Sequence, residues 1–391
     1  MLDLGATPLA NSLVAAVNRD KIEPRYPLEL LFCEGCSLVQ IGQTVAPELL
    51  FRDYVYFSSY SETMLQHARE SAAELIEQRK LNHASLVVEI ASNDGYMLKN
   101  FLAQGVPCLG IEPAINIAHA ARANGTPTIS EFFSAELAVQ LVAEGKRADV
   151  ILANNVVAHV PDVNGLVAGI KKLLKPDGVF VMETPYVKDM IDGLEFDTIY
   201  HEHVFYYSLT ALENLFHRHG LSAQDVQRLS IHGGSLRVTV GSDCAVSNSR
   251  VATLLNEERA AGMATRTYYR QFADRVICLG KELKTLLSNL KANGHSIAAY
   301  GASAKGSTLL NVFAIGAELL DFVVDRSPHK QGQLTPGTHL PIYPPERLLE
   351  CRPDYVLLLT WNFADEILAQ QAEFRAQGGR FIIPIPKLAI V

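Results

Sequence analysis

The feature that most constrains this chain is the alternation of short, fully apolar segments with segments of helical periodicity. Residues 86–90 read as a buried strand, and further strands are expected at 107–111, 149–153 and 179–183, with helices between them. Parallel strands need such crossover helices, and helices on both faces bury the sheet. The sequence therefore predicts an α/β fold with a doubly wound sheet.

The same alternation starts again nearer the C-terminus. It follows a segment at 248–293 that is rich in Leu, Ala, Glu, Lys and Arg and that we read as long helices. The opening of the chain is different, because prolines divide it into short strands and turns. A chain of 391 residues is too long to fold around one compact core. We expect an N-terminal module at 1–60, a first α/β domain at 61–247, and a helical linker with a second α/β domain at 248–391.

Composition and charge exclude several classes of protein. Hydrophobic residues make up 48% and charged residues 19%, which favours folded cores over disorder. The 34 Lys+Arg against 42 Asp+Glu give a net charge of -8 without a long basic block, so no nucleic-acid partner is expected. The chain has no run of about 18 apolar residues and no signal-peptide pattern, so we expect no membrane partner and a cytoplasmic location.

The turn after the first buried strand carries Glu89, Ala91, Asn93 and Gly95. In doubly wound sheets this turn lies in the ligand crevice. Only Gly95 remains of the glycines of a G-x-G-x-G turn, so the loop alone leaves open a ligand site or a simple turn. Glu112 ends the second strand, where a carboxylate can accept hydrogen bonds from the ribose hydroxyls of NAD or of S-adenosylmethionine; the alternative is a solvent-facing glutamate.

A helix, the Lys-Pro-Asp-Gly turn at 175–178 and the strand at 179–183 favour one of these cofactors. They resemble the segment along the fifth strand of class I S-adenosylmethionine-dependent methyltransferases. This resemblance implies a class I methyltransferase sheet with S-adenosylmethionine as the cofactor. Two further candidates for cofactor binding are Phe132, which could enclose the adenine or be ordinary core, and Asn154, which follows the strand at 149–153.

Seven short motifs then narrow the resemblance. They are Asp-Leu-Gly at 3–5, Pro-Leu-Ala-Asn-Ser at 8–12, Cys-Glu-Gly-Cys at 33–36, Ser-Asn-Asp-Gly at 92–95, Tyr-His-Glu-His at 200–203, His-Gly-Gly-Ser-Leu-Arg at 232–237 and Gly-Ala-Ser-Ala-Lys-Gly at 301–306. Together they resemble the sugar C-methyltransferases that act at C-3' of dTDP-4-keto-deoxysugars, and the match covers nearly the whole chain. The resemblance implies a small zinc-binding N-terminal domain, a methyltransferase domain and a C-terminal Rossmann-like domain. It also implies a dTDP-linked keto-deoxysugar as substrate.

Methylation of a carbon beside a ketone needs a base for the α-proton and a group that stabilises the enolate oxygen. Histidine suits the base because its pKa lies near neutrality. Carried over residue by residue, the resemblance implies His203 as the base, with Glu202 at the substrate and Tyr200 as a hydrogen-bonding neighbour. His159 and Tyr54 match further active-site positions, and either could stabilise the oxygen.

The loop at 301–306 lies between a strand and a helix of the second α/β domain and includes Ser303, Lys305 and Gly306. Its spacing is neither G-x-G-x-x-G nor a P-loop, so NAD is not expected. The resemblance implies that this domain closes over the nucleotide-sugar, with Lys305 and the loop amides at the diphosphate. The alternative is a glycine-rich turn in a structural domain.

The zinc site that the resemblance implies is incomplete here. It has four Cys ligands in two pairs, which form a closed tetrahedral site. Only Cys33 and Cys36 are present, and the chain begins where the first pair would precede Asp3. Either the start is truncated or the metal has been lost. Two thiolates leave zinc half-coordinated, so bound zinc is not expected in this chain.

We therefore predict an enzyme that transfers a methyl group from S-adenosylmethionine to the carbon, C-3', beside the 4-keto group of a nucleotide-linked deoxysugar. An alternative is an O-methyltransferase on a sugar or polyketide hydroxyl, which His203 would deprotonate. A second alternative is an inactive methyltransferase-like binding scaffold. The sequence identifies neither the sugar and its stereochemistry nor the oligomeric state.

Overall fold

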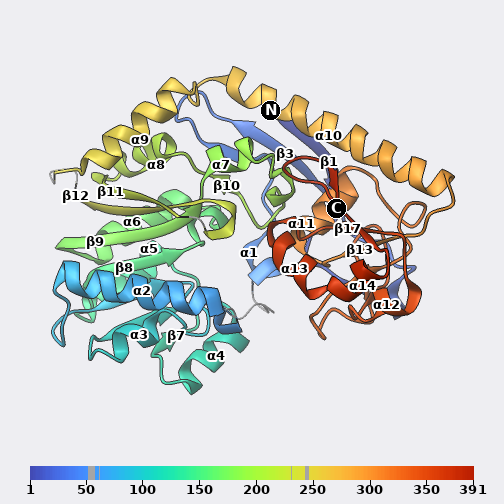
Figure 1. The fold of residues 1–391 in the computed structure, drawn as a ribbon. Helices are drawn as coiled ribbons and strands as arrows, with labels where there is room; N and C mark the ends of the chain where they lie inside the picture. Colours follow the sequence, from blue (N-terminus) through green and yellow to red (C-terminus); the bar gives the residue numbers. More distant parts are fainter. Residues whose placement is uncertain (52–57, 61, 230, 243–245) are drawn as a thin grey trace.

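The computed structural model describes residues 1–51, 58–60, 62–229, 231–242 and 246–391 (Figure 1). Its largest sheet has seven strands in the order β11-β12-β9-β8-β5-β6-β7. Their bounds are β5 Val87–Ile90, β6 Cys108–Ile111, β7 Thr128–Ile129, β8 Ala148–Asn154, β9 Leu174–Pro185, β11 Leu221–Leu229 and β12 Ser235–Ser242. Only β12 runs antiparallel to its neighbours within this sheet. The predicted α/β fold with a doubly wound sheet is confirmed.

Helices cover both faces of this sheet, which explains why its central strands are apolar throughout. The helices are α2 Glu62–Arg79, α3 Leu98–Leu102, α4 Ile115–Ala123, α5 Ala135–Ala143, α6 Val163–Leu173, α7 Val187–Asp192 and α8 Leu209–His217. Side chains of β8 alternate, so that Val150 and Leu152 pack with α2 and α3 while Ile151 and Ala153 face the larger core on the other side. All four residues of β5 are buried.

One expected boundary was wrong. The sequence predicted a turn at 175–178 before a strand at 179–183, but the structure includes these residues in β9, which begins at Leu174. The pairing of β8 with β9 shifts register at this point, so that Ala148 pairs with Leu174 and Val150 with Val179. The Lys-Pro-Asp-Gly segment is therefore an irregularity within a strand pair.

The N-terminal segment forms sheets with both α/β parts of the molecule. The strands β1 (Leu2–Thr7), β3 (Tyr26–Phe32) and β4 (Val39–Ile41) continue into β10 (Phe205–Tyr206), in the order β1-β3-β4-β10. Strand β2 (Val14–Ala15) pairs with β15 (Gln333–Leu334). The short helix α1 (Pro47–Phe51) follows. The N-terminal segment therefore connects the two halves of the molecule.

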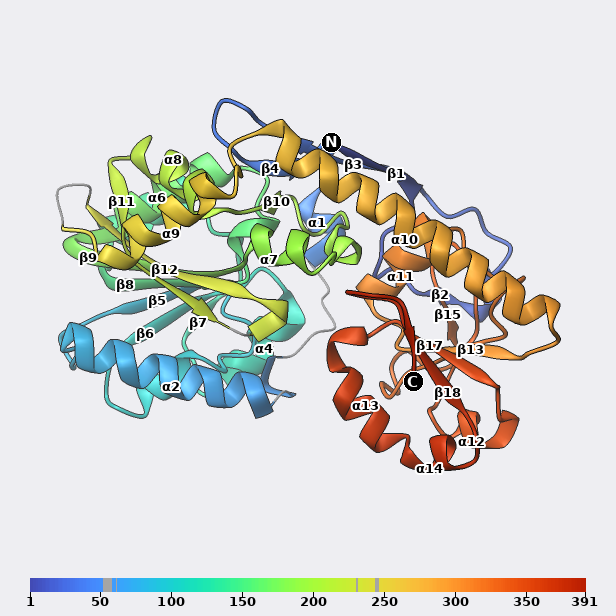
Figure 2. The same ribbon diagram turned by 45° about the horizontal axis from the view of Figure 1, so that its top comes forward.

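The second α/β part has a six-stranded sheet in the order β16-β14-β13-β17-β18-β19, in which only β19 is antiparallel. Its elements are β13 Ile297–Tyr300, α11 Ala304–Val312, β14 Val323–Val324, β16 Ile342–Tyr343, α12 Arg347–Cys351, β17 Tyr355–Leu358, α13 Ala364–Gln370, α14 Ala372–Ala376, β18 Arg380–Ile383 and β19 Ala389–Ile390. Helices α9 (Ser249–Ala260) and α10 (Arg266–Ala292) join it to the first part. With 27 residues, α10 is roughly 40 Å long, and Figure 2 shows it running beside the N-terminal strands toward the C-terminal part.

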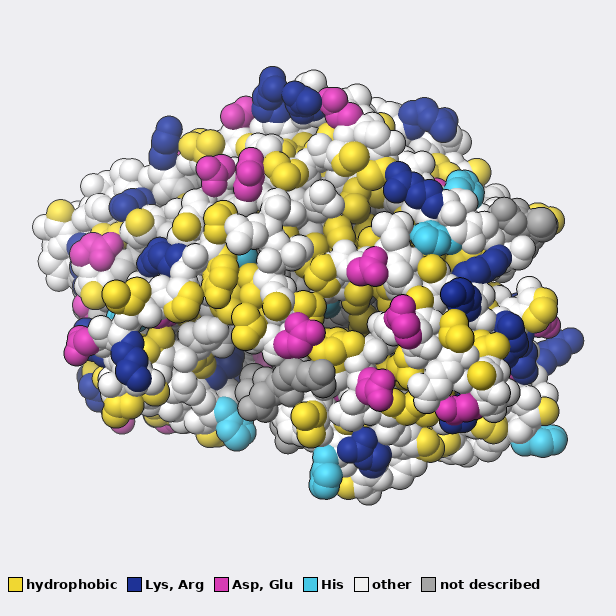
Figure 3. Space-filling view, turned by 180° about the vertical axis from the view of Figure 1, so that it is seen from behind, with side chains coloured by type: hydrophobic (Ala, Val, Ile, Leu, Met, Phe, Trp, Pro, Cys, Tyr) yellow, Lys and Arg dark blue, Asp and Glu magenta, His cyan; other side chains and the backbone are white. Residues whose placement is uncertain are grey.

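Six short 3₁₀ turns complete the described elements, and one of them, η3, carries the candidate site residue His159. They are η1 Ala16–Asn18, η2 Ser58–Tyr60, η3 Val157–His159, η4 Phe196–Thr198, η5 Ile231–Gly233 and η6 Trp361–Phe363. Figure 3 shows hydrophobic side chains gathered between the two halves of the rear face, with acidic side chains around them. No helix in the described part of the chain has the length and apolar character to cross a membrane.

Candidate active site

The loop between β5 and α3 has an unusual backbone at the cofactor candidates. Ala91 and Asn93 have φ of 50° and Gly95 has φ of 80°, all in the left-handed region. Non-glycine residues are uncommon there, so the turn is held by its surroundings. At Gly95 a Cβ would also overlap Thr126, which explains why this glycine is required. The loop is therefore a tight turn that presents its backbone at the carboxyl end of the sheet.

Glu112 lies directly after β6 and holds this loop. Its Oε2 accepts a hydrogen bond from the Asn93 N–H at 2.9 Å, and its Oε1 accepts one from the Ala114 N–H at 2.8 Å. Burial raises the pKa of Glu112, and these two hydrogen bonds partly offset that increase. The carboxylate lies where the sequence predicted it, beside the loop after β5.

Glu89 is the strongest evidence that the edge of the sheet is a ligand site. It is buried, and one carboxylate oxygen has no hydrogen-bond partner among the described residues. Burial raises the pKa of Glu89 well above its usual value, and the nearby charges of Glu112, Asp94 and Glu183 raise it further. An unpartnered buried acceptor is costly. The site therefore fits S-adenosylmethionine, which carries hydroxyl and ammonium donors and a positive sulfur.

The two other cofactor candidates lie around this edge. Asn154 is the last residue of β8 and is half-buried. Phe132 is half-buried after β7, while Phe133 packs toward α6, where it lies close to Gly169. Phe133 is thus the core residue of the pair, and the role of Phe132 at the adenine stays a prediction.

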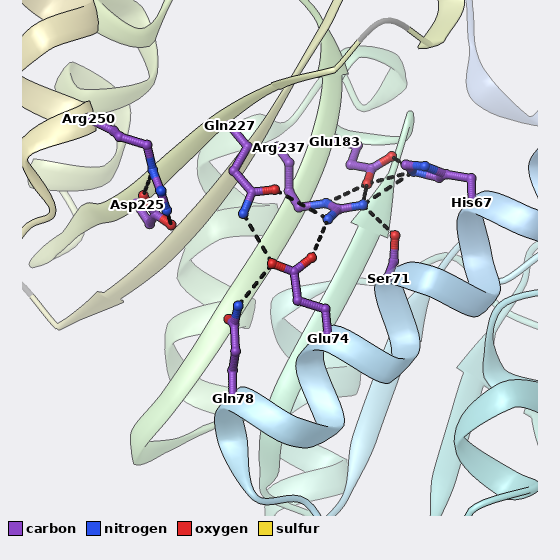
Figure 4. Close-up of polar contacts among 9 residues, drawn as sticks. All are labelled: His67, Ser71, Glu74, Gln78, Glu183, Asp225, Gln227, Arg237 and Arg250. Carbon is purple, nitrogen blue, oxygen red and sulfur yellow. Dashed lines mark hydrogen bonds and ion pairs between the residues drawn. The ribbon is translucent and has the colours of Figure 1, made fainter.

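Glu183, near the end of β9, belongs to a polar network that the sequence did not predict (Figure 4). Its carboxylate lies 2.8 Å from Nε2 of His67 and accepts a hydrogen bond from Nε of Arg237 at 2.8 Å. Arg237 also contacts Ser71 and, at 3.1 Å, Glu74. Burial by itself would raise the pKa of Glu183, but the bond from His67 and the charge of Arg237 lower it. This network joins α2 to β9 and β12 beside the cofactor edge.

His203 lies in a defined tautomer. Its Nδ1 is 2.8 Å from the carbonyl oxygen of Thr198, which can only accept, so Nδ1 carries the proton of the neutral ring. Nε2 then keeps its lone pair, and the Tyr200 hydroxyl lies 3.0 Å from it as a donor. The tyrosine and histidine rings lie 4.1 Å apart between centroids. His203 therefore presents Nε2 as a basic nitrogen.

Glu202 is buried next to this histidine and is held by the N-terminal segment. Its Oε1 accepts a hydrogen bond from Nδ2 of Asn11 at 2.7 Å. Burial raises the pKa of Glu202, and the bond from Asn11 partly offsets this. His201 points away, with its Nε2 3.2 Å from the carbonyl oxygen of Pro27. Asn11 was missed as a site residue, although it lies in the motif at 8–12.

His159, at the end of η3, joins the same group. Its ring centroid is 4.9 Å from that of His203, and its Nδ1 donates to the carbonyl of Glu202 at 2.6 Å. Burial lowers the pKa of His159, and hydrogen bonds to the backbone of Glu202 and of Asn155 partly offset this. Phe51 lies edge-on to the His159 ring at 5.6 Å. Tyr54, the remaining candidate, lies outside the described residues.

The C-terminal candidates lie at the contact between the two α/β parts. The Ser303 hydroxyl caps α11 by accepting from the Gly306 N–H at 3.1 Å. Nζ of Lys305 is 4.6 Å from the ring centroid of Trp361 and 3.9 Å from Oε2 of Glu195. Ser303 and Gly306 thus have structural roles in this loop, and Lys305 lies against acidic and aromatic groups. A contact of these residues with a diphosphate stays a prediction.

The Cys33 and Cys36 side chains do not make a four-ligand zinc site by themselves. Cys33 is exposed and Cys36 is half-buried, in the turn between β3 and β4. Among the residues that the structure describes, no group of three or more His, Cys, Asp or Glu could hold a metal ion. Tetrahedral zinc needs four ligands, so the residues present do not fit it.

Comparisons with known proteins follow the three parts of the chain. A family profile described as "C-methyltransferase C-terminal domain" matches residues 230–386, "Methyltransferase domain" matches 64–226, and "Putative zinc binding domain" matches 1–51. C-methyltransferase NovU of Streptomyces niveus is 37% identical over an alignment of 393 positions that covers 100% of this chain and 94% of that protein.

More distant similarities are confined to part of the chain. A ubiquinone biosynthesis O-methyltransferase of Bartonella bacilliformis is 27% identical over 99 residues, which is 25% of this chain and 40% of that protein. Among solved structures, magnesium protoporphyrin IX methyltransferase of Synechocystis with bound S-adenosylmethionine shares 12% identity. It covers 45% of this chain and 78% of that chain, with a TM-score of 0.35.

Proposed function

The chain belongs to the family of S-adenosylmethionine-dependent C-methyltransferases, and from this premise we propose that it methylates C-3' of a dTDP-linked 4-keto-deoxysugar. The motifs that resemble the sugar C-methyltransferases support this substrate. The observation that carries the proposal is the geometry of His203. Its Nδ1–H is bound to a carbonyl, so Nε2 is the nitrogen that can take a proton.

In this proposal Nε2 of His203 removes the proton from C-3' of the sugar. The electron pair of the broken C–H bond moves toward the 4-keto group and forms an enolate. The bound S-adenosylmethionine supplies a methyl group that is activated by the positive sulfur. The enolate carbon would form the new C–C bond to this methyl carbon while the S–CH3 bond breaks with its electron pair on sulfur, which leaves S-adenosylhomocysteine. His203 later releases the proton to solvent. The cofactor would be held by the loop of Ala91, Asn93 and Gly95 together with Glu89 and Glu112.

The enolate oxygen needs a hydrogen-bond donor. His159 and Tyr54 stay candidates for this role, and the Nδ1 of His159 already contacts the carbonyl of Glu202. We assign the role to the Tyr200 hydroxyl, which donates to His203 before the substrate binds and can turn to the oxygen when Nε2 takes the proton. Glu202, whose Oε1 is held by Asn11, is in this proposal a group at the substrate beside the base.

His203→Asn tests the base. Loss of a positioned base costs about a hundredfold to ten-thousandfold in rate, so turnover should fall by that order. Exchange of the C-3' proton with deuterated solvent should be lost as well, while the affinity for S-adenosylhomocysteine stays unchanged. The assay is mass spectrometry of dTDP-4-keto-6-deoxysugars incubated with enzyme and cofactor. His217→Asn, at an exposed histidine at the end of α8, is the control.

Three outcomes would change the assignment. Exchange that persists in His203→Asn but is abolished in Glu202→Gln would make the carboxylate the base. Transfer of the methyl group to oxygen, without exchange at carbon, would replace C-methylation by O-methylation. Lack of binding of S-adenosylmethionine by equilibrium dialysis would favour an inactive scaffold.

A further inference from the structure

The segment that holds His203 is itself held by the C-terminal part of the chain. Trp361 of η6 donates its Nε1–H to Oδ2 of Asp197 in η4 at 2.7 Å, and Asp197 is completely buried. The Phe313 ring, also from the C-terminal part, lies 4.7 Å from the Phe196 ring in the same turn. The turn η4 is therefore a docking point between the two α/β parts.

The residue after Asp197 is the one that fixes the tautomer of His203. Thr198 accepts the Nδ1–H of His203 at its carbonyl oxygen, and its hydroxyl donates to the carbonyl of Glu195 at 2.7 Å. A chain of contacts thus runs from Trp361 through Asp197 and the Thr198 carbonyl to the ring of His203. Asp197, whose side chain binds Trp361, directly precedes Thr198, whose carbonyl oxygen accepts the hydrogen bond from His203.

The buried hydrogen bond between Trp361 and Asp197 has a higher free-energy cost than an apolar contact that would dock the same turn. Burying a carboxylate is unfavourable unless it is fully hydrogen-bonded, and Oδ1 of Asp197 has no partner among the described residues. The Phe196–Phe313 contact already supplies apolar docking of this turn. A directional bond adds what an apolar contact does not, which is a fixed orientation of the peptide that follows it.

We propose that Trp361 and Asp197 are positioning residues for His203, through which the C-terminal part of the chain holds the Thr198 carbonyl on Nδ1 and keeps Nε2 basic. The proposal rests on the proposed function for the role of His203 as base. It assigns the C-terminal part a share in catalysis besides any contact with the nucleotide. The bond partner of a neutral imidazole decides which nitrogen carries the proton.

Trp361→Phe removes the N–H donor and keeps an aromatic ring beneath Lys305. The first readout is the ¹⁵N spectrum of the histidine rings, with His203 assigned by comparison with His203→Asn. The unsubstituted protein should show the Nδ1–H form for His203. In Trp361→Phe a fraction of the Nε2–H form should appear. Turnover should fall about tenfold to a hundredfold, the scale for a displaced catalytic group, with unchanged affinity for S-adenosylhomocysteine.

Phe363→Leu in the same turn η6 is the control, because this side chain is 55% exposed, and it should leave both readouts unchanged. Asp197→Asn keeps an oxygen acceptor for Trp361 and should retain turnover, whereas Asp197→Leu should lose it. If Asp197→Leu does not fold, the comparison of Trp361→Phe with Asp197→Asn tests the proposal instead. Unchanged ring signals and turnover in folded Trp361→Phe would overturn the proposal.

The spectrum separates this proposal from the proposed function, because it reads the tautomer of His203 without turnover. Full activity of His203→Asn would remove the base assignment and leave the positioning result standing. A shifted tautomer in Trp361→Phe without any loss of turnover would support the contact chain but overturn its role in catalysis.

Discussion

At the scale of single residues, two buried glutamates at the cofactor edge differ in how they are bound. Both oxygens of Glu112 accept backbone N–H groups of the loop and of the start of α4, whereas Glu89 keeps an oxygen without a partner among the described residues. Glu112 therefore shapes the loop, and its contact with a ligand stays a prediction. The oxygen of Glu89 without a partner is the one that we expect a ligand to bind.

We expect Glu112→Ala to weaken binding of S-adenosylhomocysteine by about 1–3 kcal/mol, the scale for losing hydrogen bonds to a charged acceptor. Isothermal titration calorimetry measures this change. Glu136→Ala, at an exposed position in the first turn of α5, is the matched control and should bind as the unsubstituted protein does. Equal affinities of the two variants would remove Glu112 from the site.

At the scale of elements, the network in Figure 4 attaches helix α2 to the sheet. Arg237 of β12 lies directly opposite Glu183 of β9 in the antiparallel pair. The side chains of both are largely buried, at 11% and 3% exposure. Cross-strand pairs of opposite charge stabilise a sheet, and here the pair also contacts the middle of α2, at His67, Ser71 and Glu74. Ser58 and Ser59, just before α2, donate their N–H groups to Asn93 and Asp94 of the cofactor loop.

Arg237→Met should destabilise the protein by about 3–5 kcal/mol, because it leaves the buried Glu183 carboxylate without its cationic partner. Arg250→Ala removes the neighbouring ion pair with Asp225, where the arginine side chain is 54% exposed, and should cost about 0–1 kcal/mol. Urea unfolding measures both changes.

The double variant Arg237→Met/Glu183→Gln should recover part of the lost stability, because it no longer buries an unpaired Glu183 carboxylate. A loss for Arg237→Met no greater than that for Arg250→Ala would show that the Glu183 carboxylate does not depend on the arginine.

At the scale of the whole molecule, the contact between the two α/β parts contains carboxyl groups whose pKa is raised. Burial raises the pKa of Glu195 to about 7, although the charge of Lys305 lowers it, and burial raises that of Asp197 to about 6. A carboxyl group with a raised pKa binds more protons in the folded state than in the unfolded state. The contribution of such a group to stability is therefore full below the pKa of the unfolded state and is lost as the pH rises through the pKa of the folded state.

We expect the thermal midpoint to fall between about pH 4.5 and pH 7, because the Glu195 carboxyl ionises earlier in the unfolded chain than in the folded one. The upper limit of its contribution is about 3 kcal/mol. Glu195→Gln should remove this part of the fall. Glu373→Gln, at an exposed position in α14, should keep it. Calorimetric scans from pH 5 to 8 measure the difference, and parallel curves for both variants would contradict it.

The sequence by itself determined the sheet and the edge that carries the candidate cofactor residues. Apolar strands alternate with amphipathic helices along the chain, and that pattern is local, so it can be read before folding. The same holds for Glu89, Gly95 and Glu112, because the carboxyl ends of neighbouring parallel strands meet at one edge. Tyr200, Glu202 and His203 are neighbours in sequence, and their roles in catalysis stay predictions.

Only the tertiary structure decided how these groups are held. Asn11 reaches Glu202 across 191 residues, and Trp361 reaches Asp197 across 164. A local sequence pattern does not predict a side-chain hydrogen bond between residues so far apart. Such a bond depends on how three sheets pack against one another, and no single sheet determines it. For the same reason, the motif at 200–203 does not predict which nitrogen of His203 carries the proton. It is set by a backbone carbonyl, and the sequence does not show where that carbonyl points.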